Sequence, residues 1–326
     1  MILAKSEPEF THELLFMALP FSFLANGREN VYFREKQVPT MNKLLCLFML
    51  SYCGFNGLFA QSISIKETTH AERPHYLIKT PAAAYFYDRA GGGFSRIIDT
   101  YGNDWIGFQP DSSSYPASAA TSYRGLPNLV FQGDNDGAGH PGFEQCESAK
   151  TDSVSILTTT RDGKWQWRWT FFSTYAKLDI EKVDSDRKYW FLYEGPPGGT
   201  FEPKRQYWAT NSTGWRTDQP DYYRGEIESG YWQWAYFGKQ GVGRVFFVAQ
   251  KTPDRQKDIF GYLGNSEKGV ASKDGMVVFG FGRNPETVPL LDEPQTFYIG
   301  FVNGSVSSAQ EHQRVAKEIQ QLLLQR

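Results

Sequence analysis

Residues 165 to 170 read Trp-Gln-Trp-Arg-Trp-Thr. The strict alternation places the three tryptophans on one face of an extended strand and Gln166, Arg168 and Thr170 on the other. Tryptophans in such a pattern most often belong to a core, although an indole ring can also stack on a sugar. The stretch therefore predicts a half-buried β-strand. On its polar face, Arg168 is expected either to be paired or to contact a ligand.

Short runs of β-favouring residues, each closed by Gly, Pro, Asn or Asp, recur about ten times between residues 85 and 301. No long amphipathic helix interrupts them. This pattern predicts an all-β fold, an antiparallel β-sandwich, whose long connections at 111–123 and 195–230 are suited to binding. Besides 165–172, the expected strands are 95–99, 105–108, 128–131, 153–159, 176–183, 189–193, 231–237, 244–250, 276–281 and 296–301.

The end of the chain has a different pattern. Residues 308–311 read Ser-Ala-Gln-Glu, which is a capping box for the start of a helix. Apolar side chains then recur at helical spacing, so one stripe of the helix is expected to be buried. The sequence predicts that residues 307–326 form a C-terminal helix packed on the sandwich through Val315, Ile319, Leu322 and Leu323.

The composition is that of a folded domain without a strong charge. Of the 326 residues, 40% are hydrophobic and 16% aromatic, which is enough for a sizeable core. The 34 basic and 36 acidic residues give a formal net charge of −2. Such a balance offers no general electrostatic attraction for a polyanion, so nucleic acid is not an expected partner.

The start of the chain is not expected to belong to the fold. Residues 41–60 have the basic head, apolar middle and small final residue of a signal peptide, with cleavage expected after Ala60. Their apolar part is too short and too interrupted to span a membrane. Residues 1–40 would then be an upstream extension before the real start at Met41, the alternative being a longer leader. The protein is therefore predicted to be exported (periplasmic, cell-surface or secreted), with the sandwich in 61–306.

The sequence carries no clear signal for a cofactor or a metal. Once a signal peptide is removed, Cys146 is the only cysteine, and no internal disulfide is expected. The acidic turn at 134–137 lacks the alternating ligand spacing of a calcium loop. Phosphate-binding loops, dinucleotide fingerprints and zinc-protease motifs are missing as well. We therefore expect no cofactor and no metal.

Three residues are candidates for acid–base chemistry: Glu194, His140 and Tyr193. Glu194 ends a strand before a Gly-Pro loop, on the same face as Trp190, and a carboxylate beside aromatic rings suits proton transfer. A structural ion pair is the equal alternative for this carboxylate. His140 lies in a Gly-Pro loop and is expected outside the core, either as a proton donor or as a loop anchor. Tyr193 is a second candidate for removing a proton.

Aromatic and basic side chains could hold a sugar chain. Indole rings stack on the C–H faces of sugars, and guanidinium groups bind hydroxyls or the carboxylate of a uronate. For Arg283, which would share a strand face with Phe279 and Phe281, surface pairing is the alternative. The expected substrate-binding residues are Arg124, Arg168, Arg283, Trp190, Trp232 and Trp234.

Four short motifs follow one another along the chain: Gly-Gly-Gly-Phe at 91–94, Asp-Thr-Tyr-Gly-Asn-Asp-Trp at 99–105, Arg-Gly-Leu-Pro at 124–127, and His140 before Gly142-Phe143. In this order they resemble the galactose mutarotase-like (aldose 1-epimerase) superfamily. The resemblance covers the layout of residues 85–301 and implies a β-supersandwich with a carbohydrate-active function. The leader is similar to those of secreted Bacteroidetes proteins.

The same resemblance implies roles for particular residues. A histidine followed closely by Gly-Phe protonates the sugar ring oxygen in the epimerases, and here this role would fall on His140. A glutamate late in the chain is the partner base there, for which Glu286 and Glu293 are the candidates, whereas Glu194 lies earlier than that pattern expects.

Together these observations predict an exported enzyme that acts on a poly- or oligosaccharide by β-elimination, as polysaccharide lyases do. Arg124 and Arg168 would neutralise a uronate carboxylate, His140 or Tyr193 would remove the neighbouring proton, and Glu194 would assist the leaving group. The alternatives are a sugar mutarotase, epimerase or glycoside hydrolase on the same fold, a non-catalytic glycan-binding protein, and a structural envelope protein.

Overall fold

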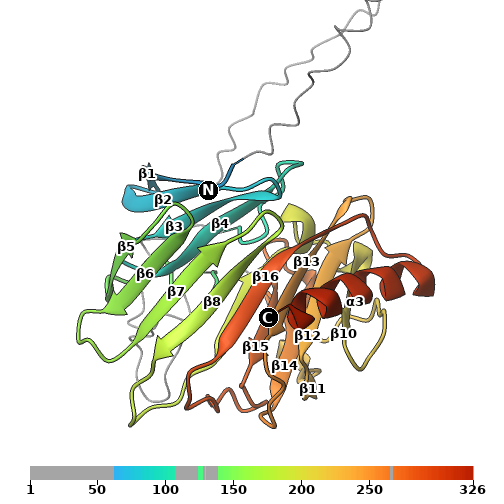
Figure 1. Cartoon of the computed structure of the whole chain (residues 1–326). Helices are drawn as coiled ribbons and strands as arrows, with labels where there is room; N and C mark the ends of the chain where they lie inside the picture. The colour runs from blue at the N-terminus through green and yellow to red at the C-terminus, as the bar shows by residue number, and fades with distance from the viewer. Residues whose placement is uncertain (1–61, 108–123, 128, 130–138, 265–266, 326) are drawn as a thin grey trace, which may run out of the picture. The chain divides into compact units, whose positions relative to one another are not determined.

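The computed structural model describes residues 62–107, 124–127, 129, 139–264 and 267–325. The upstream extension and the signal peptide lie outside the described residues, as does the acidic turn at 134–137. Within the described part the fold is an all-β sandwich of antiparallel strands with one C-terminal helix, as predicted (Figure 1).

Eight strands form the largest sheet: β5 (Cys146–Lys150), β6 (Ser155–Thr160), β7 (Gln166–Phe171), β8 (Tyr175–Lys182), β10 (Gln206–Thr210), β12 (Trp234–Lys239), β13 (Arg244–Gln250) and β16 (Thr296–Asn303). Their spatial order is β10-β12-β13-β16-β8-β7-β6-β5. Strand β13 has the predicted bounds, and β7 contains the alternating stretch from Gln166 onward, with Trp165 just before it.

Two four-stranded sheets complete the sandwich. The first has the order β1-β2-β3-β4, and the second the order β11-β14-β15-β9. Their strands are β1 (Ser64–His70), β2 (Arg73–Lys79), β3 (Ala83–Asp88), β4 (Gly93–Asp99), β9 (Phe191–Gly195), β11 (Glu228–Gly230), β14 (Asp258–Leu263) and β15 (Met276–Phe281).

One face of the eight-stranded sheet packs against both smaller sheets, so that a single aromatic core joins all three. The rings of Phe94 on β4 and Trp169 on β7 lie 4.7 Å apart, and those of Phe191 on β9 and Phe297 on β16 lie 4.5 Å apart. Trp167 and Trp169 are fully buried. The Trp face of the alternating stretch is therefore core, and its polar face is only partly covered.

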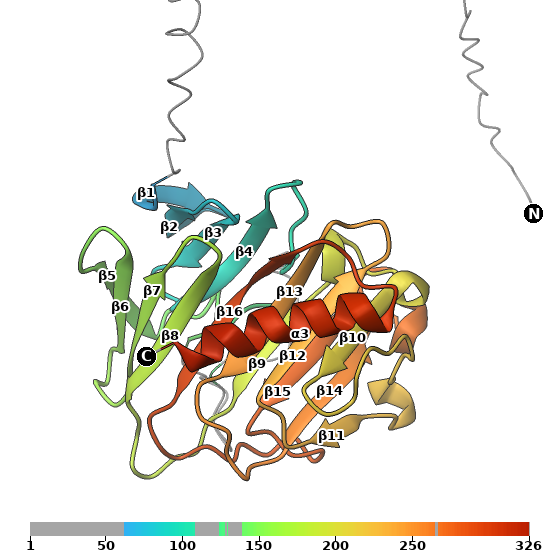
Figure 2. The same ribbon diagram turned by 45° about the vertical axis from the view of Figure 1, so that its right-hand side comes forward.

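The opposite face of the eight-stranded sheet is covered in part by helix α3 (Ala309–Leu324), which lies across β16, β13, β12 and β10 (Figure 2). Ser308 caps the helix by accepting a hydrogen bond from the backbone N–H of Glu311, as the capping box predicts. Lys251 donates hydrogen bonds to the carbonyl oxygen of Leu323 at the other end, where a cation complements the helix dipole. The buried stripe is the predicted one: Val315, Ile319, Leu322 and Leu323.

The first hairpin was missed by the strand pattern, which began at residue 85. Strands β1 and β2 are joined by Ala71 and Glu72, whose φ angles of 48° and 59° are in the left-handed region. Such two-residue turns usually contain Gly or Asn, so the local sequence carries no turn signal here. As a consequence His75, which the strand pattern left outside the sandwich, is a fully buried residue of β2.

The connection at 195–230 is also more ordered than the sequence suggested. It contains strand β10 and three short 3-10 turns: η1 (Pro197–Gly199), η2 (Pro203–Arg205) and η3 (Tyr222–Arg224). Its last part runs over strand β14 and ends in β11 at the edge of the second small sheet. The connection is therefore a structured covering of that sheet.

Candidate functional site

The strongest cluster of chemically active side chains lies on the outer face of the second small sheet. In strand β9 the side chains of Phe191 and Tyr193 enter the shared core, so Leu192 and Glu194 face the other side. Trp190, just before the strand, packs with Leu192 on this outer face. The five residues from Trp190 to Glu194 are nevertheless all buried, because further segments cover the outer face too.

Glu194 is 4% exposed and lies near the guanidinium of Arg124. The backbone N–H of Glu194 donates to the carbonyl oxygen of Gly125 over 3.1 Å, which brings the Arg124 segment alongside β9. Burial lowers the pKa of Arg124, while the carboxylates of Asp274 and Glu194 oppose this shift. The structure thus brings together two of the residues predicted from sequence, Arg124 and Glu194.

Tyr222 adds a phenol to this cluster. Its ring fills the space above Gly261 of β14, where any side chain would overlap it. Gly261 pairs with Val278, and Val278 pairs with Glu194, so the three positions form one row across the outer face. Burial raises the pKa of Tyr222, Arg283 lowers it and Glu194 raises it, and together they bring it to about 12. At neutral pH Tyr222 is therefore a protonated group on which both charges act.

Arg283 reaches the same face from the end of β15. Its Cζ atom lies 4.6 Å from the centroid of the Trp190 ring. Strand alternation would place Arg283 with Phe279 and Phe281, but those two rings are in the core. Gly282, with a φ of 64°, interrupts the alternation, and this turn directs Arg283 outward. The expected strand face of Arg283 was therefore wrong.

Asp221 holds the segment that carries Tyr222. Its carboxylate accepts hydrogen bonds from the backbone N–H groups of Tyr223 (2.9 Å) and Val270 (3.3 Å) and from Nε of Arg224 (3.1 Å). These bonds tie the 218–228 loop to the 267–272 loop. Tyr222 is thus presented by a rigid turn, and Asp221 is a positioning residue.

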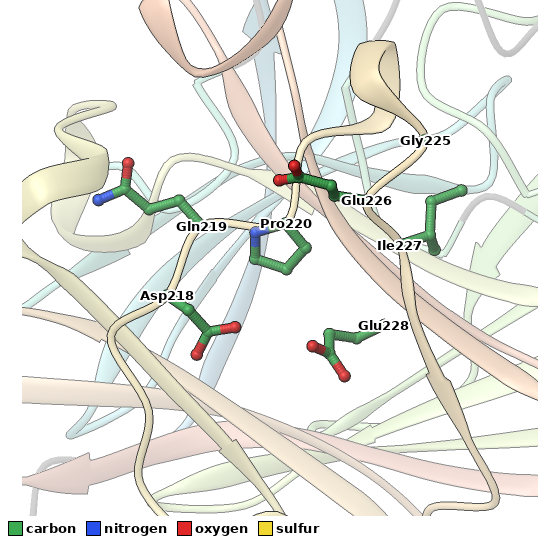
Figure 3. A pocket seen from close by; sticks show the side chains of 7 residues that line it. All are labelled: Asp218, Gln219, Pro220, Gly225, Glu226, Ile227 and Glu228. Carbon is green, nitrogen blue, oxygen red and sulfur yellow. The ribbon is translucent and has the colours of Figure 1, made fainter.

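Next to Tyr222, the same loop encloses a separate acidic pocket of about 310 Å³. Asp218 and Glu228 lie on opposite walls of it (Figure 3). Both carboxylates pair with Arg216, at 2.7 Å and 3.0 Å, and Arg216 in turn stacks over Trp208. Because both carboxylates are already paired with Arg216 within the loop, we regard this pocket as part of the loop's support.

His140 is placed differently from the expectation. Its side chain is fully buried, and its Nδ1 is 2.7 Å from the carbonyl oxygen of Pro141. Burial lowers its pKa to about 4, and Asp88 is the one charge that acts appreciably on it. The charges that act on Arg124 do not include His140. The prediction that a histidine in this loop lies outside the core was therefore wrong, and His140 belongs to a different cluster from Glu194.

The buried imidazole should make stability depend on pH. The unfolded chain takes up a proton on His140 near its ordinary pKa of 6.5, whereas the folded protein does so only near pH 4. The contribution of the neutral imidazole to the free energy of unfolding is then fully present above about pH 6.5. It decreases by about 3 kcal/mol as the pH falls toward 4. His140→Gln should flatten this slope in urea unfolding measured between pH 4 and pH 7. An unchanged slope would show that the imidazole is not buried as a neutral group.

The remaining sequence candidates lie elsewhere, and each is a correction. Tyr193 points into the core, where its hydroxyl donates to the carbonyl oxygen of Trp105 over 2.8 Å, so it cannot meet a ligand on the outer face. Trp232 stacks on Phe279 inside the core. Trp234 is buried with the residues under helix α3.

Arg168 was expected beside Arg124 but belongs to another surface. On β7 its Nε pairs with the carboxylate of Glu181 over 2.7 Å, and its Nη1 donates to Thr151. Of the two expectations for Arg168, pairing or ligand contact, the structure shows pairing. Arg283, by contrast, lies on the same outer face as Glu194, with its guanidinium over the Trp190 ring.

Two members of the cluster were not predicted. Tyr222 lies in the 195–230 connection, and the only signal for it was the general tendency of long connections to carry binding residues. Asp274 precedes β15 and accepts a hydrogen bond from Ser272 over 2.7 Å; nothing in its local sequence marks it. In the part of the chain that the structure describes, no group of three His, Cys, Asp or Glu residues could hold a metal ion, and no helix is long and apolar enough to cross a membrane.

Neither a protein-family model nor a curated protein matches the chain. Several solved structures are similar to it. The crystal structure of HI1317 is 8% identical, covers 74% of this chain and 97% of its own, and has a TM-score of 0.49. A putative mutarotase (YeaD) from Salmonella typhimurium is 7% identical, with coverages of 74% and 94% and a TM-score of 0.44.

A galactose mutarotase related enzyme from Lactobacillus acidophilus is also 7% identical, with coverages of 71% and 100% and a TM-score of 0.44. The last two are described in terms of mutarotases, the superfamily that the sequence motifs resemble. At these identities, and with TM-scores below 0.5, the likeness assigns no substrate or reaction to this chain.

Proposed function

We propose that this protein is an exported carbohydrate-active enzyme that cleaves a uronate-containing glycan by β-elimination, with Glu194 and Tyr222 as its acid–base pair. The observation that carries the proposal is that Glu194 is a buried carboxylate whose charge acts both on the guanidinium of Arg124 and on the protonated phenol of Tyr222. A base, an acid and a cation close together are the groups that this reaction needs.

The chemistry follows from these three side chains. Arg124 would pair with the carboxylate of the uronate and so acidify the adjacent C–H. The carboxylate of Glu194 would take that proton. The electron pair left on carbon forms a ring double bond as the bond to the glycosidic oxygen breaks. Tyr222 would give its proton to that oxygen, after which exchange with water restores both residues.

This assignment changes two roles expected from sequence. Tyr193 is replaced by Tyr222 because the hydroxyl of Tyr193 is bonded in the core, whereas that of Tyr222 lies near Glu194. His140 has no role in the proposed step because it belongs to the cluster around Asp88. Export rests on the signal-like segment 41–60, and N-terminal sequencing of the protein recovered from cells should find Gln61 first.

The reaction can be tested on the purified protein with a panel of uronate and neutral polysaccharides. We expect the ultraviolet absorbance of an unsaturated uronate to rise together with new reducing ends, on uronate polymers alone. New reducing ends without absorbance would replace elimination by hydrolysis. Binding with neither signal would make the protein a non-catalytic glycan binder, and the proposed reaction would be abandoned.

A further inference from the structure

Four buried polar atoms on the outer face of the second small sheet have no hydrogen-bond partner: Nε1 of Trp190, the hydroxyl oxygen of Tyr222, and Nε and Nη1 of Arg283. Trp190 itself is 5% exposed. Buried polar groups are nearly always bonded, because each one left unpaired costs about 1–3 kcal/mol. Three neighbouring residues with unmet donors therefore indicate a place where a ligand supplies acceptors.

The guanidinium of Arg283 adds a positive charge to these unpaired hydrogen-bond donors. It rests on the Trp190 ring, and its Nε and Nη1 have no hydrogen-bond partner among the described residues. Indole N–H and guanidinium N–H groups can only donate. The two residues together therefore favour an acceptor that carries negative charge, and a planar guanidinium is well matched to a carboxylate or a sulfate.

This place is distinct from the Arg124 end of the site. Trp190 and Glu194 are four residues apart along an extended strand, so their backbones are separated by about 13 Å. Arg283 stacks at the Trp190 end, whereas the Arg124 segment is hydrogen-bonded at the Glu194 end. Arg283 and Arg124 therefore belong to opposite ends of the Trp190–Glu194 segment, with Glu194 at the Arg124 end.

We propose that Trp190 and Arg283 form a second anion-binding subsite, which receives an acidic group on another sugar of the same chain. This inference rests on the proposed function, in which Arg124 receives the acidic group at the reacting sugar. The substrate class it defines is a polyanionic glycan with carboxylates or sulfates on more than one sugar.

The test compares tetrasaccharides from polygalacturonate and from alginate with their methyl-esterified counterparts, which keep the chain but not the charge. We expect the protein to bind a charged tetrasaccharide about 10- to 100-fold more tightly than its ester, as measured by calorimetry. Arg283→Gln should lose the part of that preference that the second subsite supplies and keep the part that Arg124 supplies. Arg168→Gln, which removes an equally charged side chain from another sheet, should keep both parts.

A second readout separates recognition from a merely structural role of Arg283. The indole N–H resonance of Trp190, assigned by its loss in Trp190→Phe, should shift when the charged tetrasaccharide is added and stay in place with the ester. Sulfated tetrasaccharides from heparan sulfate, compared with desulfated ones, distinguish a sulfate from a carboxylate as the bound group.

The outcomes distinguish this inference from the proposed function. If charged and uncharged chains bind equally, or if Arg283→Gln retains the whole preference, the second subsite is overturned even when the protein forms an unsaturated product. If the preference depends on Arg283 but no product forms, the subsite stands and the elimination reaction falls.

Discussion

Glu194→Gln is expected to abolish measurable elimination while leaving the fold and glycan binding intact. Positioned proton transfer typically contributes about 10²- to 10⁴-fold to a rate, and the amide cannot accept the proton. Gln has the same shape, so the packing of this 4%-exposed side chain is kept. Single-turnover measurements of the unsaturated product, together with calorimetric binding of the same glycan, separate the loss of chemistry from a loss of affinity.

Glu286→Gln and Glu293→Gln are the matched controls. Both glutamates are exposed, and they are the late glutamates to which the superfamily resemblance pointed. They should retain wild-type turnover. The assignment of the base to Glu194 would be refuted if one of these variants were inactive while Glu194→Gln still turned over substrate.

Asp88→Ala should produce the largest loss of stability. Its buried carboxylate accepts from Nε of Arg73 (2.8 Å) and from the backbone N–H groups of Ala90, Gly91 and Gly142. The Ala variant leaves all four donors without this partner. Removing one partner of a buried ion pair costs about 3–5 kcal/mol, which for a domain of this size lowers the melting temperature by on the order of 10 °C.

Glu144→Ala provides the control for Asp88. Glu144 pairs with the same arginine, Arg73, over 3.4 Å, but its side chain is 69% exposed. Exposed pairs contribute about 0–1 kcal/mol, so the melting temperature should change little. If calorimetry found that both variants lower the melting temperature equally, burial of the Asp88 network would not account for its contribution to stability.

The Asp88 network also explains why His140 was misjudged. From the sequence, a histidine between glycines and a proline looked like an exposed loop residue. In the structure the backbone N–H of Gly142 bonds to Asp88, and Gly91 packs against the backbone of His140. These contacts bury the loop against β3 and β4. They join residues 54 and 49 positions apart along the chain, which local composition cannot reveal.

The position of Glu194 could be predicted only in part. The alternation from Trp190 to Glu194 correctly put these two residues on one face. It could not tell which face is inside, because every residue of β9 is buried and polarity does not differ between its sides. The partner residues Arg124, Tyr222 and Arg283 arrive from three other segments, so their convergence on Glu194 required the fold.

By itself the sequence determined the elements whose signal is local: the alternating Trp strand, the density of strands and turns that makes the domain an antiparallel sandwich, and the capped C-terminal helix with its buried stripe. These follow from periods of two and 3.6 residues, which depend only on neighbours along the chain. The tertiary structure alone decided which buried faces lie inside, that Gly282 directs Arg283 outward, and that Tyr222 settles on Gly261. Those outcomes depend on packing between distant segments, and packing leaves no periodic trace in the sequence.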